Sequence, residues 1–386
     1  MRIGLVVPGF SADPADWCIP ALRDLVRQLA KTADVHVFAL RYPDRHMRYQ
    51  LFGAQVSALS GGQAHRLASA SLWRRAAGAI AAEHRVRRFD VLHAFWAGEP
   101  GFVAVLTGRV LGIPTVVSLA GGELARLRDI DYGGRLHAIE RVKTWLALRL
   151  ASMVTAGSAL TLASAKPWLG ARPDIRAKRI PLGVDLSMFA PTDPRPANGV
   201  PRIVHVASLV PVKDQVTLLH AAALLRDRRS PFALELVGIG PLEPELRSHI
   251  RRLGVEDVVA LRGAIAHDAL PAVYQQAHLF ALTSRHEAQG MVALEAAACG
   301  RPVVGTNVGI IPELAPAGAQ VVPVGDARAL ADGIAGFLDD DASRTQSGRS
   351  ARALVEGEYG LEQSARRYLG VYADIVRSPA VSMVGA

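Results

Sequence analysis

The stretch of sequence that decides the fold is residues 284–304, SRHEAQGMVALEAAACGRPVV. It predicts the end of a strand, a loop, a helix over 291–298, a glycine stop at Gly300 and a new strand from Pro302. A strand–loop–helix–strand unit of this kind is typical of a parallel sheet, because the helix carries the chain back to start the next strand in the same direction.

The start of the predicted helix is suited to an anion. Gly290 permits close backbone approach, and the unpaired N–H groups of the first helical turn attract negative charge without a cationic side chain. Glu287 precedes this turn and Glu295 follows about one turn inside the helix, so the two carboxylates bracket the site. Carboxylates accept hydrogen bonds from sugar hydroxyls. Spacing alone leaves open a plain capped helix with surface glutamates.

The same alternation runs outward through both halves of the chain. A linker over 183–201 separates them, and a basic region of no regular pattern spans 41–88. Expected strands are 2–7, 34–40, 90–93, 114–119, 153–156 and 179–182, then 202–207, 232–237, 258–261, 279–283 and 302–305. Expected helices are 18–30, 101–111, 135–151 and 159–165, then 215–226, 244–253, 271–277, 291–298, 327–339 and 344–376. This pattern predicts an α/β chain of two doubly wound domains, with ligands in a central cleft between them.

The composition excludes several classes of protein. With 386 residues, 50% apolar and 20% charged, the chain resembles a globular enzyme of about two domains. No apolar run reaches the roughly 18–20 residues of a membrane span. The N-terminus is a predicted strand and not a signal peptide. The two cysteines, Cys18 and Cys299, suggest no disulfide framework, so a reducing cytoplasm is expected.

The charge is divided unequally. Residues 1–190 hold 25 Lys and Arg against 14 Asp and Glu, a net of +11, and the remaining residues carry −2. Nucleic acid, an anionic membrane surface, an anionic substrate and a general bias toward arginine could each account for this excess. No aromatic stacking array is visible, so nucleic acid is discounted. The segment 85–88 and the basic helix with Trp145 could contact anionic lipid, with a solvated basic face as the alternative.

The order of several motifs along the chain resembles that of a known family. Glu287, seven residues, Glu295, then Cys299-Gly300 and Pro302-Val303-Val304 resemble the signature of glycosyltransferase family 4, retaining enzymes of the GT-B fold with two Rossmann-like domains. Further matching pieces are Val206–Asp214, Val237–Pro241, Leu261–Gly263, Gly309–Glu313 and Gly183–Asp185 with Phe189. The resemblance covers about 180–335 well and the first half in outline.

The resemblance implies roles for individual residues. Glu287 would bind the donor sugar and Lys213 would neutralise the leaving diphosphate; these two are the expected catalytic residues. Glu295 would hold the ribose hydroxyls. Residues 289–292 would present their backbone to the diphosphate, and other glycines and loop residues would border the donor. The remaining expected donor-binding residues are Gly9, Ser208, Gly238, Arg262, Gln289, Gly290, Met291 and Val292.

Two positions depart from the family pattern. Ser208 stands where many members have Arg, which removes a charge-assisted bond worth about 1.5–3 kcal/mol unless Arg285 or Arg262 substitutes. Ala120 stands where the family often has a His near the acceptor. Candidates for the acceptor side are therefore His93, Gly121 and Glu123, of which His93 can equally be structural.

The sequence thus predicts an acceptor domain over 1–188, a donor domain over 189–364 and a final helix at about 365–386 that packs back on the acceptor domain. The implied reaction is retaining transfer of a sugar from UDP- or GDP-sugar to an acceptor glycan or glycolipid. No cofactor or metal is expected, because no His, Cys, Asp or Glu cluster has metal-ligand spacing. The expected location is the cytoplasm, with contact to the inner face of a membrane. A catalytically degenerate sugar-nucleotide binder and another GT-B enzyme such as an epimerase are the alternatives.

Overall fold

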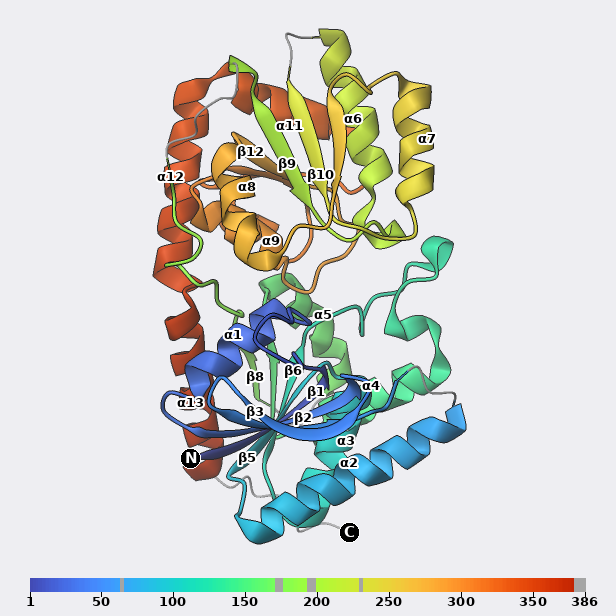
Figure 1. Ribbon diagram of the computed structural model, residues 1–386, viewed down its shortest axis with the longest axis vertical. Coiled ribbons are helices and arrows are strands. Elements are labelled where there is room, and N and C mark those ends of the chain that lie inside the picture. Colours follow the sequence, from blue (N-terminus) through green and yellow to red (C-terminus); the bar gives the residue numbers. More distant parts are fainter. Residues whose placement is uncertain (63–65, 171–175, 193–198, 229–231, 378–386) are drawn as a thin grey trace. The chain divides into compact units, whose positions relative to one another are not determined.

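The computed structural model describes residues 1–62, 66–170, 176–192, 199–228 and 232–377, and the chain divides into two compact units (Figure 1). Unit 1 consists of Met1–Gly183 and Leu361–Ala386, and unit 2 of Val184–Gly360. The boundaries therefore fall after 183 and 360, where the sequence suggested 188 and 364. Residues 378–386 of the expected final helix lie outside the described part of the chain.

Unit 1 is built on an eight-stranded sheet in the order β3-β4-β2-β1-β5-β6-β7-β8, parallel except for the β3–β4 pair. Its strands are β1 (Arg2–Gly9), β2 (Asp34–Tyr42), β3 (His46–Leu51), β4 (Ala54–Leu59), β5 (Val91–Phe95), β6 (Thr115–Leu119), β7 (Met153–Ala156) and β8 (Arg176–Arg179). Its helices are α1 (Pro20–Leu29), α2 (Arg66–Val86), α3 (Glu99–Leu111), α4 (Ala138–Leu150), α5 (Ala159–Leu169) and α13 (Leu361–Arg377).

Both faces of this sheet are covered. Along β1, Ile3, Leu5 and Val7 join the core beneath α1 and α13, and Val6 joins the core beneath α2 to α5. Successive side chains of a strand point to opposite faces, so a strand buried on both faces must be a continuous apolar run. The sequence of β1 is such a run, which explains why β1 forms the middle of the sheet.

Unit 2 is built on a six-stranded, all-parallel sheet in the order β11-β10-β9-β12-β13-β14. Its strands are β9 (Arg202–Val206), β10 (Ala233–Val237), β11 (Val259–Gly263), β12 (Leu279–Leu282), β13 (Val303–Thr306) and β14 (Ala319–Val322). Its helices are α6 (Gln215–Arg228), α7 (Glu243–Leu253), α8 (Leu270–Gln276), α9 (Met291–Ala298), α10 (Ile311–Leu314), α11 (Ala327–Asp339) and α12 (Asp341–Glu358).

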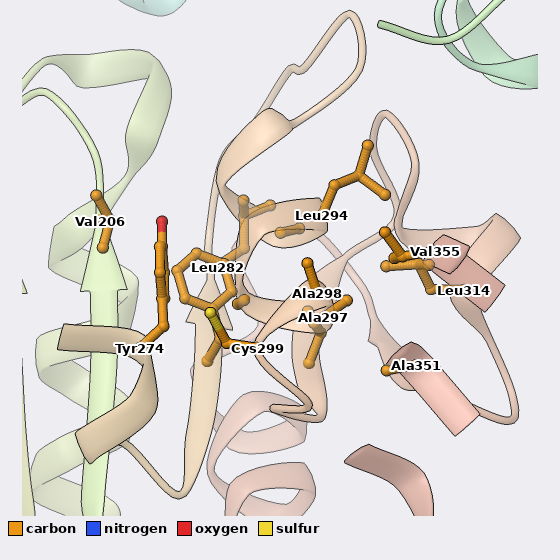
Figure 2. Close-up of a cluster of buried hydrophobic side chains, with 14 of the residues drawn as sticks. Val206, Tyr274, Leu282, Leu294, Ala297, Ala298, Cys299, Leu314, Ala351 and Val355 are labelled. Atoms are coloured by element: carbon orange, nitrogen blue, oxygen red, sulfur yellow. The ribbon is translucent and has the colours of Figure 1, made fainter. Parts of the chain in front are cut away.

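Helix α9 lies inside the core of unit 2. Its small residues Ala297 and Ala298 lie between Cys299, which is on the side of Leu282, and the α12 residues Ala351 and Val355 (Figure 2). Small side chains let neighbouring elements approach closely, and the burial fixes the helix on nearly all sides. The loop that enters α9 is therefore attached to a rigid element.

The structure corrects several expectations for secondary structure. The region 41–88, expected to be irregular, contains the β3–β4 hairpin and α2. The hairpin turn uses Phe52 and Gly53, both with positive φ, which is the geometry of a type I′ turn without its usual Asn-Gly sequence. The expected helix over 135–151 begins only at Ala138, and the expected stretch 344–376 is two helices separated at Tyr359-Gly360. Strand β14 and helix α10 were not expected at all.

Helix α13 belongs to unit 1 although it ends the described chain. The hydroxyl of Tyr372 lies 2.6 Å from Nδ1 of His93, and the Ser364 hydroxyl donates to the Pro181 carbonyl at 2.6 Å. Tyr368 and Tyr372 are fully buried in the core that also contains α1. Among the described residues, no helix is long and apolar enough to cross a membrane.

Candidate functional site

The predicted donor-binding residues of unit 2 gather at one edge of its sheet. Ser208 follows β9, Gly238 follows β10, Arg262 is the next-to-last residue of β11 and Glu287 follows β12. These four strands are parallel neighbours, so their carboxyl ends meet at the same edge, where ligands of open α/β sheets bind. The strand order thus brings together residues that are up to 79 positions apart in the sequence.

The loops at this edge pack backbone against backbone. Gly238 has φ +137°, and a Cβ there would lie 2.0 Å from the Ala207 carbonyl oxygen. The amide of Leu209 donates to the Ile239 carbonyl at 2.9 Å. Ser208 is exposed, and the Gln215 side chain donates to its carbonyl at 3.0 Å. Glycine is required at Gly238 because no other residue fits both the φ and the space.

Lys213 and Glu287 form an ion pair, with Nζ 2.5 Å from Oε1. The Ser284 hydroxyl donates to the same oxygen at 2.6 Å. Lys213 comes from a short 3-10 helix, Pro211–Lys213, whose loop is tied to the end of β12 by the Arg285 amide, which donates to the Val212 carbonyl at 2.8 Å. Both charged side chains keep some solvent exposure, 23% and 13%. The two expected catalytic residues are thus in direct contact.

Gly290 begins α9 with φ +92°. The turn before it is held by Gly309, whose Cβ, if present, would lie 2.3 Å from the Gln289 carbonyl oxygen. The Ile310 amide donates to that same oxygen at 2.7 Å. Met291 and Val292, the first residues of α9, are half-buried. The four residues expected to face a diphosphate therefore form one continuous, braced turn.

Glu295 lies deeper than its role in the resemblance suggests. It is 6% exposed, and its carboxylate accepts the Tyr274 hydroxyl at 2.8 Å and lies 3.1 Å from Nε2 of His267. Burial and the charge of Glu295 together hold the pKa of Tyr274 well above its usual value. The sequence did not predict Tyr274 or His267 as partners of Glu295. A Tyr at core spacing on a helix and a single His show no local pattern that would link them to a distant carboxylate. Ribose binding by Glu295 stays a prediction.

Arg262 is a candidate to supply the positive charge that many family members have at the position of Ser208. Its side chain is 51% exposed, and Nη1 lies 3.9 Å from Oε1 of Glu235 on β10. The next residue, Gly263, has φ +71° and open space around its Cβ position. The guanidinium is therefore at the expected edge of the sheet, in a long, partly screened contact with Glu235.

In unit 1, Gly9 ends β1 beside the end of β2, and a Cβ there would lie 3.0 Å from Cβ of Tyr42. His93 is corrected to a structural residue. It is fully buried in β5, its two ring nitrogens lie 2.6 and 2.7 Å from the hydroxyls of Tyr372 and Ser118, and burial lowers its pKa to about 3. A ring sealed in the sheet in this way does not face an acceptor.

Glu123 joins the loops that follow β5 and β6. Its carboxylate accepts the amides of Ala97 at 3.1 Å, Ala120 at 3.2 Å and Gly121 at 2.7 Å, and the residue is 8% exposed. A Cβ on Gly121 would lie 2.5 Å from the indole nitrogen of Trp96. Glu123 therefore shapes the carboxyl-end loops of this sheet, and Gly121 allows them to close on Trp96. Within the described residues, no group of three or more His, Cys, Asp and Glu is placed to hold a metal ion.

Known proteins resemble the chain in both halves. Residues 191–354 match the family described as "Glycosyl transferases group 1", and residues 21–188 match "Glycosyltransferase Family 4". D-inositol 3-phosphate glycosyltransferase of Kineococcus radiotolerans is 30% identical over 331 residues, which cover 78% of this chain and 74% of that protein. Alpha-D-kanosaminyltransferase of Streptomyces kanamyceticus is 26% identical over 297 residues, 73% of this chain and 76% of that one.

Solved structures agree in fold. Sucrose-phosphate synthase from Thermosynechococcus elongatus superposes with a TM-score of 0.80 at 20% identity and covers 98% of this chain and 100% of its own. Anabaena HepE in complex with UDP-glucose gives a TM-score of 0.73 at 21% identity, over 97% and 100%. These structures confirm the expected α/β GT-B fold. The family matches and the named relatives confirm the expected enzyme. The predicted donor-binding residues of unit 2 lie at one edge of its sheet, which we call the donor edge, and the two family matches together cover most of the chain. The chain belongs to glycosyltransferase family 4 and is a nucleotide-sugar-dependent glycosyltransferase of the GT-B fold.

Proposed function

We propose that the protein is a retaining glycosyltransferase that moves a sugar from a UDP-sugar, with GDP-sugar as the second choice, to an anionic acceptor. The observation that carries the proposal is the contact between Lys213 and Glu287 beside the glycine turn at the start of α9. This arrangement offers a cation, a row of backbone N–H groups and a carboxylate within one loop cluster. The first two suit a diphosphate and the third suits a sugar hydroxyl.

Charge explains what each group would do during transfer. When the bond from the anomeric carbon to the diphosphate oxygen breaks, negative charge grows on the diphosphate and positive charge on the sugar. Lys213 and the N-terminus of α9 stabilise the diphosphate. We propose on this basis that no metal is required, because the chain itself supplies positive charge at that position.

Retention follows from attack on the face that the diphosphate leaves. The acceptor oxygen forms its bond to the anomeric carbon, and the departing phosphate oxygen takes the acceptor's proton, so no covalent sugar–enzyme bond is needed. Glu287 suits a binding role more than a nucleophilic one, because Oε1 already accepts hydrogen bonds from Lys213 and Ser284. Its second oxygen is the one to hold the donor sugar.

Three observations support the choice of substrates. Uridine is favoured because HepE, of the same fold, was solved with UDP-glucose. An anionic acceptor is favoured because residues 1–190 carry a net charge of +11, and several relatives are named for transfer to D-inositol 3-phosphate. A phosphorylated polyol or a lipid-linked glycan carries negative charge, which the positive charge of residues 1–190 would attract. We propose a cytoplasmic enzyme whose acceptor half contacts an anionic membrane.

The test combines thermal shift and donor hydrolysis against UDP-, GDP- and ADP-sugars, with and without EDTA. One UDP-sugar should raise the melting temperature and be hydrolysed slowly, unaffected by EDTA. Glu287→Gln and Lys213→Met should each lower turnover by about 100-fold or more, the order of effect of a lost charge-stabilising contact. Glu243→Gln is the control, since Glu243 pairs only with Arg247 on the surface of α7.

Three outcomes would contradict the proposal. If EDTA abolished turnover and Mg²⁺ restored it, the reaction would require a metal ion. A product with inverted anomeric configuration, determined from NMR coupling constants, would show that the enzyme is inverting. Unchanged turnover in Glu287→Gln would move the chemistry away from this loop.

A further inference from the structure

One helix of unit 1, α4, presents a group of apolar side chains outward. On α4, the exposed residues include Ile139, Val142 and Trp145, with 48%, 55% and 46% of their surface accessible. A helix of a soluble protein normally presents polar side chains outward. Single exposed apolar residues need no explanation, but here several share one arc of a short helix. The three residues and Ala138, also exposed, recur at helical spacing on that arc.

The inward face of the same helix carries two polar side chains beside the buried Ala147 and Leu148. Lys143 is 7% exposed and Thr144 is 1% exposed, and both lie on the side that packs into the unit. Nζ of Lys143 lies 2.5 Å from Oε1 of Glu140, the acidic residue of α4. The helix therefore neutralises its own negative charge on the inner side. Its outward arc combines apolar side chains with the exposed Arg141 and the half-buried Arg149.

Cations accompany the apolar arc. Arg141 is exposed beside it, and the guanidinium of Arg149 lies 5.7 Å from the Trp145 ring centroid. Arg135, just before α4, lies 5.8 Å from the ring of Trp168 on α5. Arginine beside tryptophan suits the boundary between lipid headgroups and acyl chains, because the ring tolerates both media and the long cation reaches the phosphates.

We propose that this α4 face, Ile139, Val142 and Trp145 with Arg135, Arg141 and Arg149, docks on an anionic lipid bilayer with the helix lying in the plane of the interface. The inference specifies the membrane contact within the proposed function and does not depend on the transfer chemistry.

The size and charge of the α4 face favour a bilayer over a protein partner. A stable protein interface buries about 800 Å² on each side with matched shape and charge. Three apolar side chains on 13 residues of helix fall short of that, and a second copy would bring its own arginines against these. A bilayer needs no shape complementarity, and its anionic headgroups match the arginines.

The experiment is co-sedimentation of the full-length protein with vesicles of phosphatidylcholine, alone or mixed with phosphatidylglycerol. We expect binding to the anionic vesicles to be roughly a hundredfold tighter, from three arginines at the surface, and to weaken as salt is raised. Val142→Ser/Trp145→Ser and Arg141→Gln/Arg149→Gln should each reduce binding at least about tenfold.

Matched controls come from unit 2. Val324→Ser removes another exposed valine (43%, against 55% for Val142) and Arg247→Gln removes an exposed arginine, and both variants should bind vesicles as the wild type does. Loss of binding in Arg85→Gln/Arg87→Gln with no effect of the α4 variants would overturn the proposal in favour of the other basic segment. A concentration-dependent dimer that only the α4 variants dissolve would overturn it in favour of a second copy.

Donor hydrolysis without vesicles separates this inference from the proposed function. All variants of the α4 face should hydrolyse the donor at the wild-type rate. Vesicle binding with no hydrolysis of any donor would count against the proposed function alone. Normal hydrolysis with equal sedimentation on neutral and anionic vesicles would count against the α4 face alone.

Discussion

At the scale of single residues, the two glutamates of the family signature occupy different environments. Glu287 is partly exposed and shares one oxygen with Lys213 and Ser284. Glu295 is buried and is held by Tyr274 and His267. The same residue type, with seven residues between the two positions, can therefore serve two purposes, one toward the ligand and one toward the stability of the site.

This difference predicts opposite results for matched substitutions. Glu295→Gln should lower the free energy of unfolding by about 1–3 kcal/mol, because an amide has one acceptor oxygen where the carboxylate has two, so one of the two buried contacts is lost. Glu287→Gln should change stability by less and lose turnover instead. Urea unfolding and donor hydrolysis on both variants measure the contrast. A Glu295→Gln protein of wild-type stability would show that the contacts to Tyr274 and His267 contribute little.

At the scale of elements, the turn into α9 is shaped by its neighbour. Gly309, in the loop after β13, has φ +52° and approaches the Gln289 carbonyl more closely than any side chain would permit. The residues expected to face the diphosphate are thus positioned by a different loop. Glu123 has the same function in unit 1, where one carboxylate holds the loops after β5 and β6.

Gly309→Ala tests this coupling. The new Cβ would displace the Gln289–Gly290 turn, and we expect donor affinity to fall at least about tenfold, since backbone donors must lie within hydrogen-bond reach of the phosphates. Gly325→Ala is the control: its φ is +77°, so it has the same backbone strain, but its Cβ would meet open space. Isothermal titration with UDP measures both. Equal losses in the two variants would assign the effect to backbone strain alone.

At the scale of the whole molecule, each unit has a neutral histidine at the centre of its sheet. Burial lowers the pKa of His93 on β5 to about 3 and that of His205 on β9 to about 4. In the unfolded chain both would titrate near 6.5. Below that pH the unfolded state binds more protons than the folded state, so stability falls as the pH falls from about 6.5 toward 4.

Both units should therefore weaken in mild acid, each by up to about 1.4 kcal/mol per pH unit for its histidine. Urea unfolding at pH 7.5 and 5.0, with hydrogen exchange to resolve the units, measures the loss. His93→Gln keeps a polar side chain but cannot titrate, so it should reduce the pH dependence of unit 1 and leave that of unit 2 unchanged. A stability that is flat between these pH values would contradict the assignment of both rings as neutral.

Much of the fold and of the donor edge was predictable from the sequence because the signals are local. Apolar runs such as 2–7 and the 291–298 helix follow from periodicity over a few residues. Parallel topology then places the ends of neighbouring strands together, so Ser208, Gly238 and Glu287 could be assigned to one edge. The β3–β4 hairpin was not predicted, because Phe52-Gly53 is an unusual sequence for its turn and β3 is a half-exposed edge strand.

By itself, then, the sequence determined the α/β class, the family and the residues that lie at the donor edge. Only the tertiary structure decided that Glu295 is enclosed by His267 and Tyr274, and that His93 is sealed by Tyr372, 279 positions away. It also decided that Ile139, Val142 and Trp145 of α4 face outward. The physical reason is that burial and side-chain pairing depend on which elements pack together, whereas periodicity and motif spacing depend only on neighbours along the chain.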